Sequence, residues 1–331
     1  YTDRDNKFSI VNAPMMVNRA GLFAMSPKHG VVIFWPNATL VGRTPQPSIG
    51  AGRMALNVGS LDGAVIRGFS FANFAAKPKN YASGTAILSN SNVDRLTIAD
   101  NAFRAFVNLG NGMGVVHLVG GTGLSVKRNQ FLQMPATSAV VIDNAPGPVL
   151  VQCNKIADIG RTGIRFNNVV AGRILANDIR GLNGIHGNGI SAYNDIRDVV
   201  IAGNVVVDTL RPLTVHGTTT PKYSHGTPGV RVVNNVFIST SADAAAITSY
   251  GKTPNFVVEN NFLSAPRFAM RLNGSETGFA AAGNTLVGGV NVASKAALFD
   301  AGRNTQHSVD GNGALLTTTQ TRATVAPADC R

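Results

Sequence analysis

The side chains best suited to chemistry recur at the end of short β-rich runs. Asp143 closes AVVID, Tyr193 closes GISAY and His216 closes PLTVH, while Arg165 lies two residues before the end of GIRFN. An imidazole titrates near neutral pH and can serve as a base, and a guanidinium binds carboxylates through a planar fork of donors. A base, a phenolic acid and a bound carboxylate together support removal of a proton next to that carboxylate. We therefore take His216, Tyr193, Arg165 and Asp143 as the candidate catalytic residues, with Arg165 as the carboxylate-binding cation, His216 or Tyr193 as the base and Tyr193 as the acid.

These side chains can act together only if the runs are aligned strands. The runs are rich in β-branched and small residues and lack helical periodicity, as strands do. Side chains alternate between the two faces of a strand, so Arg165 is expected to point outward and Ile164 and Phe166 inward. Stacking then predicts two outward files. The first file is His117, Val141, Arg165, Ser191 and Thr214, and the second file is Asp143, Asn167, Tyr193, His216 and, with an ambiguous register, Tyr250.

Loops near these runs add candidate binding residues. GLNGIHGNG (181–189) carries His186 just before the Tyr193 run, and TTTPKYSHGTPG (218–229) is the longest interruption between strand pairs. Long loops on a rigid scaffold concentrate function. The candidate substrate-binding residues are Asn167, His186, His117, Lys222, Tyr223, His225, Tyr250 and Arg271.

A second pattern, an apolar strand that ends in asparagine, repeats along most of the chain. Its asparagines are 20 to 31 residues apart, at positions 101, 129, 154, 177, 204, 235, 261, 284 and 304, and Phe69 takes the same place in VIRGFSF. A constant motif with variable spacing predicts identical strands joined by loops of changing length. Asparagine tolerates the left-handed backbone of a tight turn, and stacked asparagines can hydrogen-bond between coils. The pattern predicts an all-β solenoid whose coils pack only on their neighbours.

The motif is clearest in TGIRFNNVVAGRILAN and NGISAYNDIRDVVIAGN, and it resembles the pectate-lyase-like superfamily of right-handed parallel β-helices. The resemblance spans roughly residues 31–312. It implies a right-handed single-stranded parallel β-helix of about ten coils with an asparagine ladder. Members of this superfamily bind saccharide along the strand before the asparagine strand. They include polyuronide lyases, mannuronan epimerases, glycoside hydrolases and phage tailspikes.

We expect one domain over residues 1–331, with a cap at 1–30, coils at 31–312 and a tail at 313–331. No apolar stretch is long enough to span a membrane. The chain begins at Tyr1, and we expect a secreted or periplasmic protein whose signal peptide has been removed. Cys153 lies in an apolar strand pattern, which favours a buried free thiol, while a bridge to Cys330 stays open.

The formal net charge of +12 fits either a generally basic surface that keeps the protein soluble or a polyanionic partner, which would be a nucleic acid or an acidic polysaccharide. No dense Lys/Arg run, zinc-finger spacing or aromatic RNA-binding motif is present, so nucleic acid is not expected. Nor is any cofactor expected. No metal-ligand spacing is present, although backbone oxygens leave calcium open.

Charge and resemblance together lead us to expect an enzyme that acts on a uronate polysaccharide by β-elimination or C5 epimerisation. Mannuronan epimerases of this superfamily carry an Asp/His/Tyr cluster, to which Asp143, His216 and Tyr193 are similar in kind, but their Asp-Pro-His-Asp motif is absent. A glycoside hydrolase would need two carboxylates, for which Asp143 and Asp195 are available. A non-catalytic adhesin or tailspike-like binding surface is a further alternative. Sugar, linkage, mode of attack and oligomeric state stay open.

Overall fold

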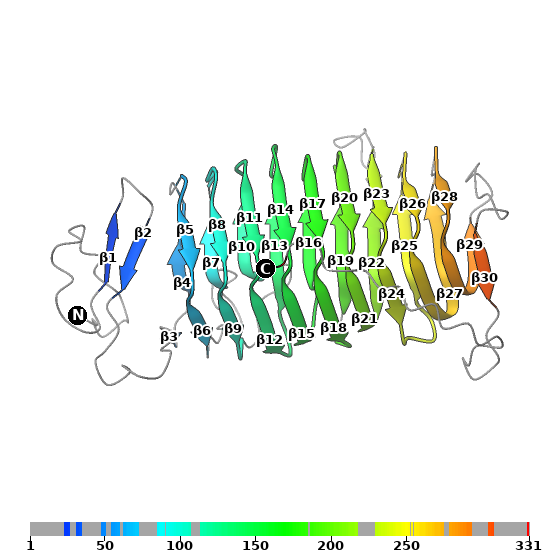
Figure 1. The fold of residues 1–331 in the computed structure, drawn as a ribbon, viewed down its shortest axis with the longest axis horizontal. Helices are drawn as coiled ribbons and strands as arrows, with labels where there is room; N and C mark the ends of the chain where they lie inside the picture. The colour runs from blue at the N-terminus through cyan, green and yellow to red at the C-terminus, as the bar shows by residue number, and fades with distance from the viewer. Residues whose placement is uncertain are drawn as a thin grey trace.

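The structure is a computed structural model. It describes residues 23–26, 31–34, 48–50, 54–59, 62–72, 85–89, 91–106, 113–184, 186–217, 229–251, 253, 255–274, 278–292, 304–307 and 330. These residues form strands and turns without a helix. The strands stack side by side along one axis and make a right-handed parallel β-solenoid, as Figure 1 shows.

Each coil contributes one strand to each of three faces. The site face holds the strands that precede the asparagine motif, namely β4 (Met54–Asn57), β7 (Thr85–Ser89), β10 (Gly114–Val119), β13 (Ser138–Asp143), β16 (Ile164–Asn167), β19 (Asn188–Tyr193), β22 (Arg211–His216) and β25 (Ala245–Gly251). The ladder face is one sheet of β1 (Phe23–Ser26), β2 (Val31–Phe34), β5 (Val65–Arg67), β8 (Thr97–Ala99), β11 (Leu124–Lys127), β14 (Val149–Gln152), β17 (Gly172–Leu175), β20 (Val199–Ala202), β23 (Val230–Val233), β26 (Val257–Glu259) and β28 (Ala280–Ala282).

The third face follows each asparagine. It holds β3 (Ser48–Gly50), β6 (Ser70–Ala72), β9 (Ala102–Arg104), β12 (Gln130–Met134), β15 (Lys155–Ile159), β18 (Asp178–Leu182), β21 (Val205–Thr209), β24 (Val236–Ser239) and β30 (Thr305–His307). Two long strands, β27 (Phe262–Gly274) and β29 (Thr285–Val292), pair first with the third face and then with the site face. Pairing is parallel throughout the described strands except where β1 lies antiparallel to β2.

The predicted fold class is confirmed, with a slightly different coil count. The strands from β10 to β29 make about seven turns, and the strands before β10 continue the same sheets, whereas the sequence predicted about ten coils. The core of the solenoid is filled by inward side chains, which stack from coil to coil at equivalent positions of successive strands. Phe103, for example, is fully buried and stacks on Phe71 at 4.9 Å and on Phe131 at 4.7 Å between ring centroids.

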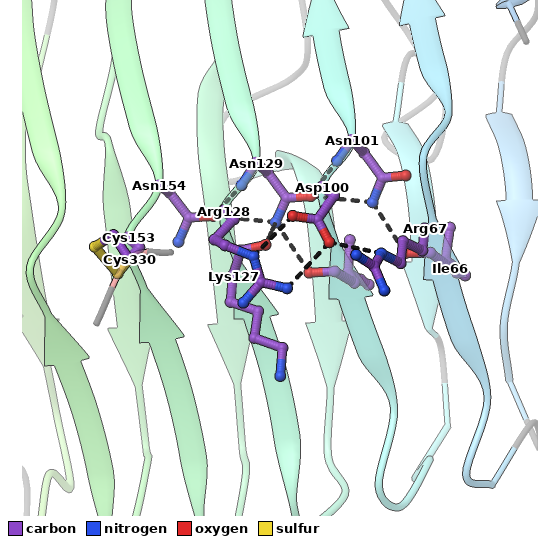
Figure 2. A network of polar contacts seen from close by, with 11 residues as sticks. Ile66, Arg67, Asp100, Asn101, Lys127, Arg128, Asn129, Cys153, Asn154 and Cys330 are labelled. Carbon is purple, nitrogen blue, oxygen red and sulfur yellow. Dashed lines mark hydrogen bonds and ion pairs between the residues drawn. A yellow bond between two sulfur atoms is a disulfide. The ribbon is translucent and has the colours of Figure 1, made fainter. Parts of the chain in front are cut away.

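The predicted asparagine ladder is present. The Asn129 Nδ2 donates to Asn154 Oδ1 at 3.0 Å (Figure 2). It also donates to the Ile98 carbonyl at 2.9 Å. The backbone N–H of Asn129 also donates to the Asn154 Oδ1, at 3.0 Å. The same pattern links successive asparagines from 101 to 304. At the position that lacks an asparagine, the Phe69 N–H donates to Asn101 Oδ1 at 2.9 Å.

The conformation expected for the ladder asparagines was wrong. From Asn101 to Asn284, the residue with positive φ is the one before the ladder asparagine, and examples are Asp100 (φ 57°), Arg128 (φ 54°) and Cys153 (φ 55°). The tight bend is therefore made one position earlier. The asparagine itself has no positive φ, and it turns its side chain inward, where it is at most 2% exposed from Asn101 to Asn284. Asp100 also bridges two coils through Arg67 and Arg128, as Figure 2 shows.

The expectation of a free thiol at Cys153 is corrected. Cys153 forms a disulfide with Cys330, 177 residues along the chain (Figure 2). Cys153 is partly exposed because it occupies the left-handed turn position after β14 rather than the interior of the strand. The bridge ties Cys330 to the middle of the solenoid.

Candidate functional site

The strand pairings reproduce both predicted files. The first file pairs His117 with Val141, then Arg165, Ser191 and Thr214, and it continues to Thr248 and Arg271. The second file pairs Asp143 with Asn167, then Tyr193, His216 and Tyr250, and it continues to Asn273. The ambiguous register of Tyr250 is thereby settled. Residues far apart in the chain stand on neighbouring strands, which lie about 4.8 Å apart.

Most of the first file is covered rather than open to solvent. His117 is 6% exposed, Ser191 0% and Thr214 2%. Val141 is fully buried, although it lies outside the apolar core that contains Val140 and Ile142. Val141 is enclosed because His117 and Arg165, on either side of it in the file, both reach across to Asp143.

Asp143 joins three neighbouring coils through its carboxylate. His117 Nε2 lies 2.8 Å from Asp143 Oδ2. One terminal nitrogen of Arg165 donates to both Asp143 oxygens at 3.3 Å. Burial raises the pKa of the Asp143 carboxyl, but the hydrogen bond with His117 and the charge of Arg165 outweigh burial, and the net pKa is below the ordinary value of 3.8. Asp143 is therefore ionised at neutral pH and holds Arg165 in place.

An aromatic stack follows in the second file. The rings of Tyr193 and His216 lie 4.5 Å apart at 13°, and those of His216 and Tyr250 lie 4.6 Å apart at 24°. Burial lowers the pKa of His216 below 6.5, and the nearby charge of Arg211 lowers it further. The imidazole is consequently neutral at neutral pH, which is the state that accepts a proton.

A hollow of about 330 Å³ opens on the site face beside these groups. Four of its lining residues were candidates from the sequence, namely Arg165, Asn167, His186 and Tyr193. Four were not anticipated, namely Ser138, Arg161, Thr162 and Asn194. Among the described residues no carboxylate lines this hollow, and two guanidinium groups do, so its polar character favours an anionic ligand.

The unanticipated residues reveal a third outward file at the start of the strands. Ser138 and Thr162 line the hollow, and Asn188 Nδ2 donates to the outward Ser191 Oγ at 3.2 Å. Strict alternation would turn Thr162 inward and Gly163 outward. A Cβ on Gly163 would instead meet Ile179 and Leu182 of the core at 3.2 and 3.3 Å. Gly163 therefore faces the core, and Thr162 faces the hollow. We call Ser138, Thr162, Asn188 and Arg211 the third file, since Asn188 pairs with Arg211.

The remaining candidates lie at the margins or outside the described residues. His117 and Asp143 lie on the coils before Arg165, and Tyr250 and Arg271 lie beyond His216. Asp195 is paired with Arg197 at 2.6 Å. Lys222, Tyr223 and His225 fall outside the described residues. Within the described ranges there is no cluster of three potential metal ligands, and no helix is long and apolar enough to cross a membrane.

A fold of this kind with this site places the chain in a known structural class. The chain belongs to the right-handed β-helix family, because the family model described as "right handed beta helix region" matches residues 114–286, just over half of the 331 residues. The pectate-lyase-like resemblance noted in the sequence is confirmed at the level of the superfamily. No curated protein matches the chain.

Two solved structures match the chain at low identity. One is the Dettilon tailspike protein (gp208), with 12% identity and a TM-score of 0.25 over 79% of this chain and 63% of the tailspike. The other is the catalytic unit of a thermostable GH87 α-1,3-glucanase from Streptomyces thermodiastaticus strain HF3-3, with 13% identity and a TM-score of 0.21 over 80% of this chain and 62% of the glucanase. The chain thus spans less than two thirds of either structure.

Proposed function

We propose that the protein is a carbohydrate-active enzyme that acts on an acidic, uronate-containing polysaccharide by β-elimination or C5 epimerisation. The hollow carries the proposal, because Arg161 and Arg165 line it together with Tyr193, and the neutral His216 stacks directly on Tyr193. A substrate carboxylate bound to Arg165 would place the neighbouring C5–H among groups that can exchange protons.

Each group has a role in this scheme. Arg165, held by Asp143, binds the uronate carboxylate and stabilises the negative charge that develops when C5 is deprotonated. His216 removes the C5 proton. In β-elimination the released electron pair forms the C4–C5 double bond, the C4–O bond breaks, and the Tyr193 phenol protonates the departing oxygen. In epimerisation no C–O bond breaks, and a proton returns to the opposite face of C5.

Glycoside hydrolysis, as a second enzymatic scheme, has less support. It requires two carboxylates about 5–10 Å apart, one of them free to act as an acid. Asp143 is engaged by His117 and Arg165, and Asp195 is paired with Arg197. A passive adhesin or tailspike-like surface would bind the same polymers without turnover.

The location we propose is secreted or periplasmic. A structural disulfide such as Cys153–Cys330 persists in oxidising compartments, and polysaccharides of this kind are met outside the cytoplasm.

A panel of uronate polymers tests the proposal. The enzyme is incubated in D₂O with alginate, pectate and related polymers. Ultraviolet absorbance then reports unsaturated products, and NMR reports deuterium at C5 and any inversion there. New reducing ends without absorbance would indicate hydrolysis, and binding without any product would indicate an adhesin. Either result, across a broad panel, would overturn the proposal.

Two variants test the assignment of the proton-transfer groups. Tyr193→Phe keeps the ring stack and removes only the hydroxyl, and His216→Phe keeps the stack and removes the imidazole. Each should lower kcat by about a hundredfold or more, the usual contribution of a positioned acid or base, while thermal unfolding changes little. Arg104→Gln, exposed on β9 of the third face, is the control and should keep wild-type kcat. Retained activity in both ring variants would mean that the site is misplaced.

A further inference from the structure

We infer that Arg211 forms a second carboxylate-binding subsite, with Asn188 and Thr214, two coils along the site face from Arg165. The inference rests on the proposed function and deepens it, because it makes the ligand a run of at least two uronates rather than a single acidic sugar.

Arg211 lies on the same face as the hollow. It pairs with Asn188 on β19, and Asn188 holds the third-file position one coil beyond Thr162, which lines the hollow. The charge of Arg211 also lowers the pKa of His216 in the second file. The third file therefore leads directly from the hollow to Arg211.

Two buried polar atoms lack partners on residues close to Arg211 in the sheet: Asn188 pairs with Arg211, and Thr214 lies three residues further along β22. Asn188 is 2% exposed and its Oδ1 accepts no hydrogen bond, although its Nδ2 donates to Ser191. Thr214 is 2% exposed and its Oγ1 likewise has no partner. Buried polar atoms in native proteins are almost always hydrogen-bonded to protein, water or ligand. An unpaired acceptor and an unpaired hydroxyl next to a guanidinium are the groups that a hydroxylated, carboxylated sugar would satisfy.

The charge on Arg211 is also uncompensated within the described part of the chain. Arg165 is held by Asp143, whereas no Asp or Glu of the described residues lies within 4.0 Å of Arg211. A partly buried guanidinium without a counterion attracts an anion. Strand spacing of about 4.8 Å puts Arg211 about 10 Å from Arg165 along the solenoid axis, a distance that a disaccharide unit bridges.

The test compares two forms of one ligand. Binding of fully charged tri-galacturonate, tri-mannuronate and tri-guluronate is measured by calorimetry, together with the same trisaccharides esterified to leave one free carboxylate. Arg211→Gln should weaken binding of a fully charged trisaccharide by about tenfold to a hundredfold, as loss of a charge-assisted hydrogen bond implies. Binding of the singly charged form should stay within about twofold of wild type. Arg211→Lys should give an intermediate result.

Controls separate the subsite from general electrostatics. Arg104→Gln removes the same charge from the third face and should leave binding of both ligands unchanged. The inference would be overturned if Arg211→Gln weakened binding of the fully charged and the singly charged trisaccharides equally, or did not weaken binding of the fully charged one. In either case, turnover of uronate polymers by wild type would still support the proposed function. If Arg211→Gln weakens binding of the fully charged trisaccharide alone, but wild type turns over no uronate polymer, the subsite is supported and the proposed enzymatic function is rejected. Wild type that binds none of the trisaccharides would reject both.

Discussion

Replacing one ladder asparagine tests the energetic basis of the solenoid. Asn204 is fully buried at the centre of the ladder. Its side chain donates to Asn235 Oδ1, to the Ile174 carbonyl and to the Ala202 carbonyl, at 2.9 to 3.1 Å. Its Oδ1 accepts from both the backbone N–H and the Nδ2 of Asn177. Asn204→Ala removes all of these bonds.

The loss is unevenly distributed among the neighbours. The Asn177 Nδ2 keeps its bond to Val151, and the Asn235 Oδ1 keeps the backbone N–H of residue 204. The backbone N–H of Asn177 loses its bond to this side chain at the buried turn, and the carbonyl of Ile174, within strand β17, loses the bond it accepts from it. Each buried polar group left unpaired costs about 1–3 kcal/mol, so Asn204→Ala should destabilise the protein by about 2–5 kcal/mol.

Two measurements check this value. Equilibrium denaturation gives the free energy of unfolding, and hydrogen exchange shows where protection is lost, since solenoid coils couple mainly to their neighbours. Protection should fall first in β17, β20 and β23. Gln130→Ala, an exposed amide that follows ladder residue Asn129, should change stability by less than about 0.5 kcal/mol. If Asn204→Ala costs no more than Gln130→Ala, the ladder hydrogen bonds do not stabilise the fold.

Four further outcomes are expected. The double variant Cys153→Ser/Cys330→Ser should have a free energy of unfolding about 5 kcal/mol lower than wild type in the chain-entropy view. A reductant should lower the free energy of unfolding of wild type and leave that of the double variant unchanged. Phe103→Ala, which opens the stacked core, should cost about 3–5 kcal/mol in the same measurement. The folded pKa of Asp143 is below 3.8, so its stabilising contribution is complete above that pH and is lost as pH falls through the folded pKa; Asp143→Asn should flatten this acid limb of stability. His216 has a pKa below 6.5, so kcat should persist below pH 6.5, and Arg211→Gln should move the acid limb of kcat to higher pH.

The sequence predicts the strands and their stacking well because both depend on local periodicity. Inward and outward positions alternate along GIRFN and GISAY, and a repeated motif aligns them. Arg165, Ser191, Tyr193 and His216 accordingly occupy the paired positions expected of them.

Features that depend on departures from periodicity could not be predicted in this way. The third file arises where Thr162 and Gly163 break the alternation, and GRTG gives no sign of it beyond its small residues. The bend of each coil needs one residue with positive φ, and the residue before the asparagine takes this conformation. Side chains as different as those of Asp100 and Arg128 occupy it, so residue type does not reveal the position. Pairing of Cys153 with Cys330 joins distant segments, and no local pattern encodes it.

The asparagine ladder also has a direction. Each Oδ1 receives a backbone N–H from the preceding coil as well as a side-chain N–H, so a reversed amide would turn its NH₂ group toward two donors. No single amide can reverse without losing bonds on both sides, and all the amide dipoles therefore point the same way along the axis. Aligned bonds of this kind polarise one another. The backbone N–H groups fix the orientation at every position of the row, and in the described residues the row starts at Asn101, because Phe69 can offer only its backbone N–H.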